Sequence, residues 1–304
     1  MSRKAERKLK ELESRSEVAE TSVGPVEYAV AGHGPPILAI HGGPGGFDQS
    51  LGVYDMFVDA GFQIICPSRP GYLRTPISVG RTYESQARAM AALLDEIGVE
   101  KVSVVGGSAG GPPTYEFARL FPERTTSLVA IDALCMTYNM PDQAGKIQQA
   151  IYLSDTGMAL TLWMTRHMPH SAVKGIIATE GLLDKEQVKE RVSQIIEDDR
   201  KVRWCYELFQ SMYPYSARKD GVDNDLEQGR NLDRLPLNQI KVPALIIHGD
   251  ADADVGISHG RYAAESIEEA EHIWVEGGTH LCFWVSDEAY EVQRKTFQFI
   301  RDHL

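Results

Sequence analysis

The sequence predicts an α/β fold with a mostly parallel, doubly wound sheet and a helical segment inserted into it. Short apolar runs rich in β-branched residues recur along the 304-residue chain, and helical patterns lie between several of them. Apolar runs without alternation are typical of strands buried on both faces of a sheet, and strands alternating with helices are typical of doubly wound domains. The alternation stops after residue 131 and resumes near residue 241.

Apolar runs and helical periodicity give the order of the expected elements. Strands are expected at residues 26–30, 37–40, 62–66, 102–105, 127–131, 244–248 and 272–275. Helices are expected at residues 83–98, 115–121 and 288–304, and inside the insertion at residues 144–155, 157–168, 185–198 and 200–213. The charged first twenty residues are also expected to form a helix. We therefore expect an α/β core of residues 1–135 and 235–304, and a helical cap of residues 136–234.

Composition and charge narrow the class of partner. The chain is 43% hydrophobic and 24% charged, as in soluble globular proteins, and its net charge of −12 argues against nucleic acid and anionic membranes as partners. We expect a small-molecule substrate instead. The four cysteines are far apart and match no zinc spacing, so we expect reduced thiols, no metal and a cytoplasmic protein. A homodimer is compatible with the sequence, which leaves the oligomeric state open.

The stretch VVGGSAGGPP, residues 104–113, is the strongest local motif. It lacks the Lys-Ser/Thr pair of a phosphate-binding P-loop and the third glycine of a dinucleotide-binding turn. Gly106 to Gly110 fit GxSxG between a strand and a helix, the setting in which a sharp turn exposes a nucleophilic serine. The two prolines fall in the first helical turn, where a missing N–H is tolerated. The motif therefore predicts that Ser108 is a nucleophile.

A serine nucleophile needs a base, and the base needs an acid that orients it. His280 follows the strand at 272–275 in a glycine-bearing loop, and we expect it to be the base. Asp252 follows the strand at 244–248 and is the expected acid, at the sheet edge where α/β domains place their sites. Asp250 and Asp254 are weaker candidates beside it, and Asp132, at the end of another strand, is a further alternative.

Two backbone N–H groups are expected to bind the oxyanion that forms when the serine attacks a carbonyl. Gly43 lies in the glycine-rich loop HGGPGGFDQ, residues 41–49, directly after an early strand. Ala109 follows the serine at the start of the next helix. We expect these two residues to form the oxyanion hole and His41 to hold the loop in place.

Four stretches in order resemble the α/β-hydrolase superfamily: HGGPGG, GGSAGG, HGDAD and GGTH. The resemblance covers nearly the whole chain and implies that the helical insertion is a cap over the site. The HGGPG loop is similar to that of proline iminopeptidases. That subfamily usually has tryptophan after the serine, where this chain has Ala109, and the turn is more similar to those of carboxylesterases and C–C bond hydrolases.

We therefore expect a serine hydrolase that cleaves a carboxylic ester of a small or medium apolar substrate through an acyl-enzyme, without a cofactor. The alternatives are an aminopeptidase similar to proline iminopeptidases and a C–C bond hydrolase acting on diketone-type acids. Arg166, His167 and His170 are candidates for binding a substrate carboxylate, whereas Glu180 is expected to be a charge on a helix surface. The expected pocket residues are Trp163, Met164, Trp204, Phe209, Phe283 and Trp284.

Overall fold

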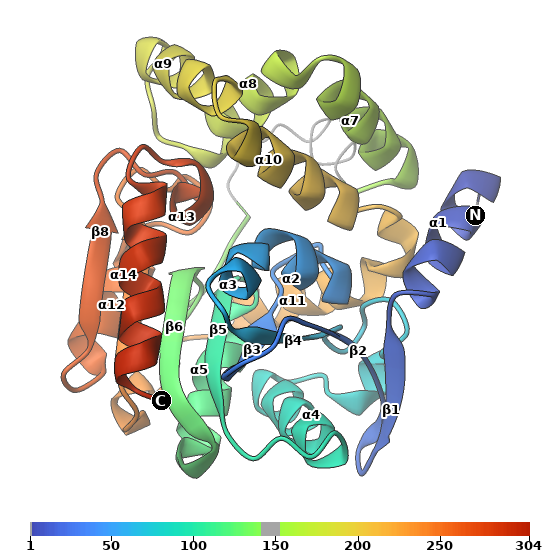
Figure 1. Ribbon diagram of the computed structural model, residues 1–304, viewed down its shortest axis with the longest axis vertical. Helices are drawn as coiled ribbons and strands as arrows, with labels where there is room; N and C mark the ends of the chain where they lie inside the picture. The colour runs from blue at the N-terminus through green and yellow to red at the C-terminus, as the bar shows by residue number, and fades with distance from the viewer. Residues whose placement is uncertain (1, 141–152) are drawn as a thin grey trace.

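The computed structural model describes residues 2–140 and 153–304, and at its centre lies an eight-stranded sheet covered by helices (Figure 1). From edge to edge the strands follow the order β1-β2-β4-β3-β5-β6-β7-β8. β2 pairs antiparallel with β1 and with β4, and the remaining neighbours pair parallel. The predicted fold class, a mostly parallel and doubly wound sheet, is confirmed.

The strands are β1 Glu17–Thr21, β2 Gly24–Ala31, β3 Pro36–Ile40, β4 Gln63–Pro67, β5 Val102–Ser108, β6 Thr125–Ala133, β7 Ala244–Gly249 and β8 Glu271–Val275. The helices are α1 Arg3–Glu13, α2 Phe47–Val53, α3 Asp55–Asp59, α4 Tyr83–Glu96, α5 Gly111–Leu120, α7 Asp155–His167, α8 Pro169–Glu180, α9 Lys185–Ile196, α10 Asp199–Ser211, α11 Lys219–Asn231, α12 Ser258–Ser266, α13 Cys282–Val285 and α14 Ala289–Asp302. None of these helices is both long and apolar enough to cross a membrane. The elements not expected from the sequence are β1, α2, α3, α8, α11, α12 and α13. The helix expected at 144–155 lies almost entirely outside the described residues.

Helices cover both faces of the sheet, so the central strands are buried on both sides. On one face Val105 and Ile131 belong to a cluster with residues of α3 and α14. On the other face Val104 and Ala130 belong to a cluster with residues of α4, α5 and α12. Adjacent residues of a strand point to opposite faces, and both faces need apolar side chains here. This explains the unbroken apolar runs in the sequence.

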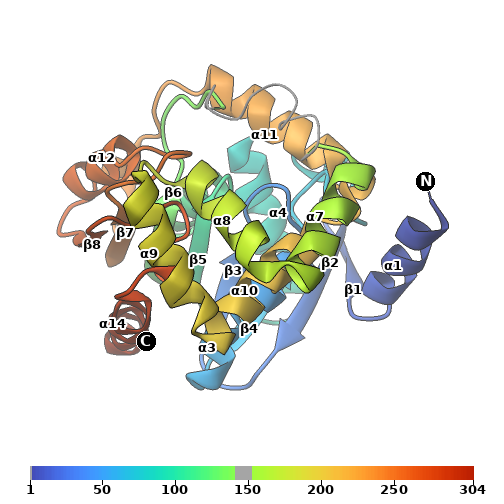
Figure 2. The same cartoon turned by 90° about the horizontal axis from the view of Figure 1, so that it is seen from above.

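The chain between β6 and β7 carries helices α7 to α11. In Figure 1, α7, α8, α9 and α10 lie above the sheet, and Figure 2 shows the same helices from above. Met136 and Arg234, at the two ends of the expected insertion, pair in an isolated antiparallel bridge. The inserted segment therefore leaves and rejoins the sheet domain at one place.

Two buried arginine–aspartate pairs fasten α11 and the turn before it to loops of the sheet domain. Arg69, in the loop after β4, donates to both carboxylate oxygens of Asp225 on α11, at 2.8 and 2.6 Å. Arg218, just before α11, donates to both oxygens of Asp48 on α2, at 3.0 and 2.8 Å. Because each pair has two parallel hydrogen bonds, it fixes the relative orientation of the two segments as well as the distance between them. α11 is thus attached to the sheet domain.

The turn between β5 and α5 leaves no space for a side chain at Gly110. A Cβ there would lie 2.4 Å from the carbonyl oxygen of His41 and 3.0 Å from that of Gly107. Gly110→Ala is therefore expected to destabilise the protein by about 3 kcal/mol, because backbone must move to accept the methyl group. Urea denaturation followed by circular dichroism measures this loss.

Gly175→Ala is the matched control, because a Cβ at this position of α8 has nothing within 4 Å. That variant is expected to be neutral or more stable by about 0.5–1 kcal/mol, since alanine is the better helix former. Equal stability of the Gly110 and Gly175 variants would contradict the close packing of the turn.

Candidate active site

The turn between β5 and α5 exposes Ser108 at the upper end of the sheet. Ser108 is the last residue of β5 and has a φ of +51°, in the left-handed region that non-glycine residues rarely adopt. A Cβ at Gly106 would lie 2.1 Å from Oγ1 of Thr114, and one at Gly110 would lie 2.4 Å from the carbonyl oxygen of His41, so both flanking positions favour glycine. This strained backbone directs the Ser108 side chain away from the sheet and is typical of functional sites.

His280 and Asp252 form a buried hydrogen-bonded pair. His280 lies in the loop after β8, and its Nδ1 is 2.7 Å from Oδ2 of Asp252, which lies in the loop after β7. The other oxygen of Asp252, Oδ1, accepts the backbone N–H groups of Asp254 and Val255 at 2.8 and 2.9 Å. The Asp252 carboxylate is therefore fixed by its own loop and presents one oxygen to the imidazole.

The charges around this pair favour its ionised form. Burial by itself would lower the pKa of the His280 imidazole, but Asp252 and, more weakly, Asp254 and Glu180 raise it well above its usual value. Burial would raise the pKa of Asp252, but His280 and His248 lower it to about 2. The carboxylate thus stabilises an imidazolium, the state that His280 reaches when it accepts a proton.

Ser108 and His280 line the same cavity, of about 120 Å³, between the sheet and the cap. Its apolar wall is formed by Val53, Tyr54, Ile131, Ile176, Trp204, Leu208, Met212, Leu281 and Trp284. Apart from His280, the acidic side chains in the wall are the carboxyl groups of Asp132, Glu180 and Asp254, and no lysine or arginine of the described residues lines it. The cavity is therefore largely apolar, with acidic groups as its only charges besides the imidazole.

The alpha/beta hydrolase fold family matches residues 35–157. A solved structure, an alpha/beta hydrolase fold protein from Nakamurella multipartita, is 36% identical in sequence and has a TM-score of 0.90. The similarity covers 94% of this chain and 99% of that one. The chain belongs to the alpha/beta hydrolase family.

Two curated proteins extend the comparison. The hydrolase is 29% identical to an uncharacterised hydrolase of Bacillus subtilis, over 92% of this chain and 96% of that protein. It is 24% identical to a 2-hydroxy-6-oxo-6-phenylhexa-2,4-dienoate hydrolase of Comamonas testosteroni, over 91% of each chain. The similarity to hydrolases thus spans both the sheet domain and the insertion.

The hydrolase has two unoccupied backbone donors beside Ser108. The backbone N–H groups of Gly43 and Ala109 donate no hydrogen bond to any other described residue. A Cβ at Gly43 would lie 3.5 Å from the Cβ of Ala109, so the two residues are neighbours across the site. His41 supports this loop, because its ring bonds the carbonyl of Gly42 at 2.7 Å and accepts the backbone N–H of Arg69 at 2.9 Å. The two N–H groups are therefore free donors on neighbouring residues close to Ser108.

The other candidate acids have different partners. Asp250 is exposed and accepts the backbone N–H of Gly277 at 2.7 Å. Asp254 accepts the hydroxyl of Tyr138 at 2.5 Å through Oδ1, and its Oδ2 lies 3.6 Å from Nε2 of His280. No hydrogen bond joins Nε2 to Ser108 among the described residues, and such bonds commonly tighten only when substrate is bound.

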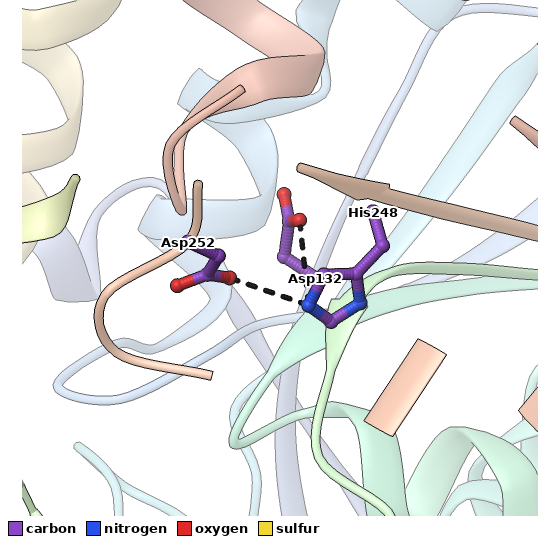
Figure 3. Close-up of side chains that lie close together, drawn as sticks. All are labelled: Asp132, His248 and Asp252. Atoms are coloured by element: carbon purple, nitrogen blue, oxygen red, sulfur yellow. Dashed lines mark ion pairs between the residues drawn. The ribbon is translucent and has the colours of Figure 1, made fainter. Parts of the chain in front are cut away.

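A second imidazole, that of His248, lies beside Asp252 and Asp132 (Figure 3). Nε2 of His248 is 3.5 Å from Asp252 and 3.9 Å from Asp132. The three side chains are close enough to suggest a metal site. However, Nε2 is also 2.7 Å from the carbonyl oxygen of Val255, to which it must donate a proton, so it has no lone pair for a metal.

Asp132 is held at the back of the site. It accepts the backbone N–H of Gly249 at 2.8 Å and the thiol of Cys282 at 3.3 Å. Burial raises its pKa to about 6, although the nearby His248 opposes this shift. Asp132 is therefore a hydrogen-bonded buried acid beside Asp252, whereas Asp252 is the acid that accepts the hydrogen bond of His280.

The structure places two of the six expected pocket residues in the cavity wall. These are Trp204 and Trp284, which stack on each other with ring centres 4.8 Å apart. Phe209 and Phe283 instead belong to the buried apolar core. Trp163 and Met164 lie on α7 outside the cavity wall, and Trp163 is half exposed and stacks on His167. Helical spacing marks the four cap residues as apolar without indicating which face meets the cavity, and Phe283 and Trp284 were expected there because they follow His280.

Glu180 is the site residue that the sequence analysis misplaced. It was expected on a helix surface, but it ends α8 and lines the cavity. Burial and the nearby Asp254 raise its pKa to about 8. No sequence signal marks it, because its position depends on how α8 packs against the loops of β7 and β8.

Asp252→Asn is expected to lower the pKa of His280, because the uncharged amide no longer stabilises the imidazolium. Titration of the imidazole signals by nuclear magnetic resonance measures the change. Asp250→Asn is the matched control, since Asp250 is exposed and bonds only the neighbouring loop. An unchanged His280 pKa in Asp252→Asn, or equal shifts in both variants, would contradict the assigned pair.

Proposed function

We propose that this hydrolase cleaves carboxylic esters of small or medium apolar substrates through an acyl-enzyme. Ser108 attacks the ester carbonyl carbon while His280 accepts the hydroxyl proton, and Asp252 stabilises the imidazolium that forms. The N–H groups of Gly43 and Ala109 bind the oxyanion. His280 then protonates the leaving alcohol as the C–O bond breaks. Water, deprotonated by His280, hydrolyses the acyl-enzyme, and Ser108 recovers its proton as the acid leaves.

The proposal rests on one cavity. Its lining contains the proposed nucleophile, Ser108, and a mostly apolar wall. Ser108 and His280 meet nine apolar side chains there, and no lysine or arginine of the described residues lines the wall. An apolar wall suits the hydrocarbon part of an ester. The three groups that the proposed reaction needs are near this wall: the half-buried serine, the oriented imidazole and the free N–H donors.

The same observation disfavours the C–C bond hydrolase alternative. The relative from Comamonas testosteroni is named for a dienoate, which carries a carboxylate. A substrate carboxylate needs a cationic partner in a cavity of this kind. Arg166, His167 and His170, the candidates for that partner, are all exposed and lie outside the cavity wall. We therefore favour an ester over an anionic diketone.

Ser108→Ala and His280→Ala are each expected to lower kcat/KM for p-nitrophenyl butyrate by at least about 10³-fold, since nucleophile and base act as a unit. Release of p-nitrophenol measures the rate, and circular dichroism confirms folding. His272→Ala is the control, because His272 is exposed on β8 and lies outside the cavity wall. Near-normal turnover in either site variant would refute the mechanism.

A substrate panel separates the proposed function from its alternatives. It contains p-nitrophenyl esters of increasing acyl length, a proline arylamide and a vinylogous diketone acid. We expect the esters to have the highest kcat/KM. A higher value for the arylamide would favour an aminopeptidase, and a higher value for the diketone would favour a C–C bond hydrolase.

A further inference from the structure

Two acidic side chains face the cavity beside His280, and no lysine or arginine of the described residues accompanies them. Glu180 forms no side-chain hydrogen bond or ion pair with any described residue. Asp254 uses Oδ1 for the Tyr138 hydroxyl, and its Oδ2 lies 3.6 Å from Nε2 of His280. His280 is nine-tenths buried, and Nε2 has no hydrogen-bond partner among the described residues. Two acids thus share one imidazole at this end of the cavity.

Glu180 is held at this position by the backbone on both sides of the site. Its carbonyl accepts the N–H of His280 at 3.0 Å and the N–H of Ala253 at 3.2 Å. The next residues continue the contact, because Leu182 donates its N–H to the carbonyl of Ala251 at 2.7 Å. The end of α8 is therefore joined to the loops that carry Asp252 and His280, and Glu180 keeps its place beside the imidazole.

An acid at this place is unfavourable for the empty protein. A carboxylate at the C-terminus of a helix meets the negative end of the helix dipole. Burial and Asp254 act in the same direction, since both raise the pKa of Glu180. A strongly perturbed group inside a cleft is typical of functional positions. A bound cation would offset all of these effects at once.

The geometry assigns this end of the cavity to the alcohol part of the substrate. His280 must protonate the leaving alcohol, so the groups around its Nε2 surround that alcohol in the reaction. We propose, on the basis of the proposed esterase function, that the natural substrate is an ester of an alcohol carrying a cationic amine, recognised by Glu180 and Asp254. The apolar remainder of the wall then receives the acyl chain.

Two butyrate esters test this directly. One has 2-(trimethylammonio)ethanol as its alcohol, and the other has 3,3-dimethylbutanol, which replaces the charged nitrogen with carbon at the same shape. We expect the wild-type enzyme to prefer the cationic ester by about tenfold or more in kcat/KM, the effect of one charge-assisted contact. Glu180→Gln is expected to reduce that ratio toward one. Equal rates for the two esters in the wild type would overturn the proposal.

Glu190→Gln is the matched control, because Glu190 is an exposed acid of the neighbouring helix α9 outside the cavity wall. It is expected to keep the wild-type ratio, which excludes a general effect of net charge. Retention of the full ratio in Glu180→Gln would also count against the proposal. The acyl side is tested with two p-nitrophenyl esters, one of glycine, whose acyl group carries a cation, and one of acetic acid, whose acyl group does not. If the enzyme prefers the cation only in this pair, the placement of the cation on the alcohol is contradicted.

Binding to Ser108→Ala separates failure of this inference from failure of the esterase function. Calorimetry measures the affinity of this variant for 2-(trimethylammonio)ethanol and for 3,3-dimethylbutanol. Neither measurement requires turnover. Stronger binding of the cation supports the inference even if no ester is cleaved, whereas equal binding overturns it. Ester cleavage that persists in Ser108→Ala would overturn the esterase function alone.

Discussion

The buried pair of Arg69 and Asp225 is the contact on which the upper face of the molecule depends. Arg69 is fully buried, and besides Asp225 it donates to the carbonyl oxygen of His41 at 3.0 Å. The backbone N–H of Arg69 bonds the His41 ring, which in turn holds Gly42. One guanidinium thus joins the loops after β3 and β4 to α11. Breaking a buried pair of this kind typically costs about 3–5 kcal/mol, because it leaves an uncompensated charge.

The parallel strands impose the second constraint. Their carboxyl ends meet at one edge of the sheet, so residues that follow different strands become neighbours. Ser108 ends β5, Asp252 follows β7 and His280 follows β8. Because each of these positions is marked locally, by a glycine turn or by a polar residue after an apolar run, the sequence was sufficient to predict them. The fold class was predictable for the same reason, since apolar runs and helical periods are local patterns.

The cavity wall was less predictable, because it depends on how helices of the insertion pack. Trp163 and Trp204 both stand in amphipathic helices, yet Trp163 stacks on His167 at the surface and Trp204 lines the cavity. Periodicity identifies an apolar face but not the element that covers it. Glu180 shows the same limit, since long-range hydrogen bonds bring it into the site, among them those that its carbonyl accepts from His280 and Ala253.

The acids of the site differ in their hydrogen-bond partners, and this difference separates their proposed roles. Asp252 has every oxygen engaged, by two backbone N–H groups and by His280, and its pKa is lowered to about 2. Glu180 has no such donors, and its pKa is raised to about 8. A carboxylate that already has its partners orients a catalytic imidazole, whereas one without them is available to a ligand. The proposed charge on the substrate alcohol and the proposed role of His280 as base therefore rest on the same electrostatics.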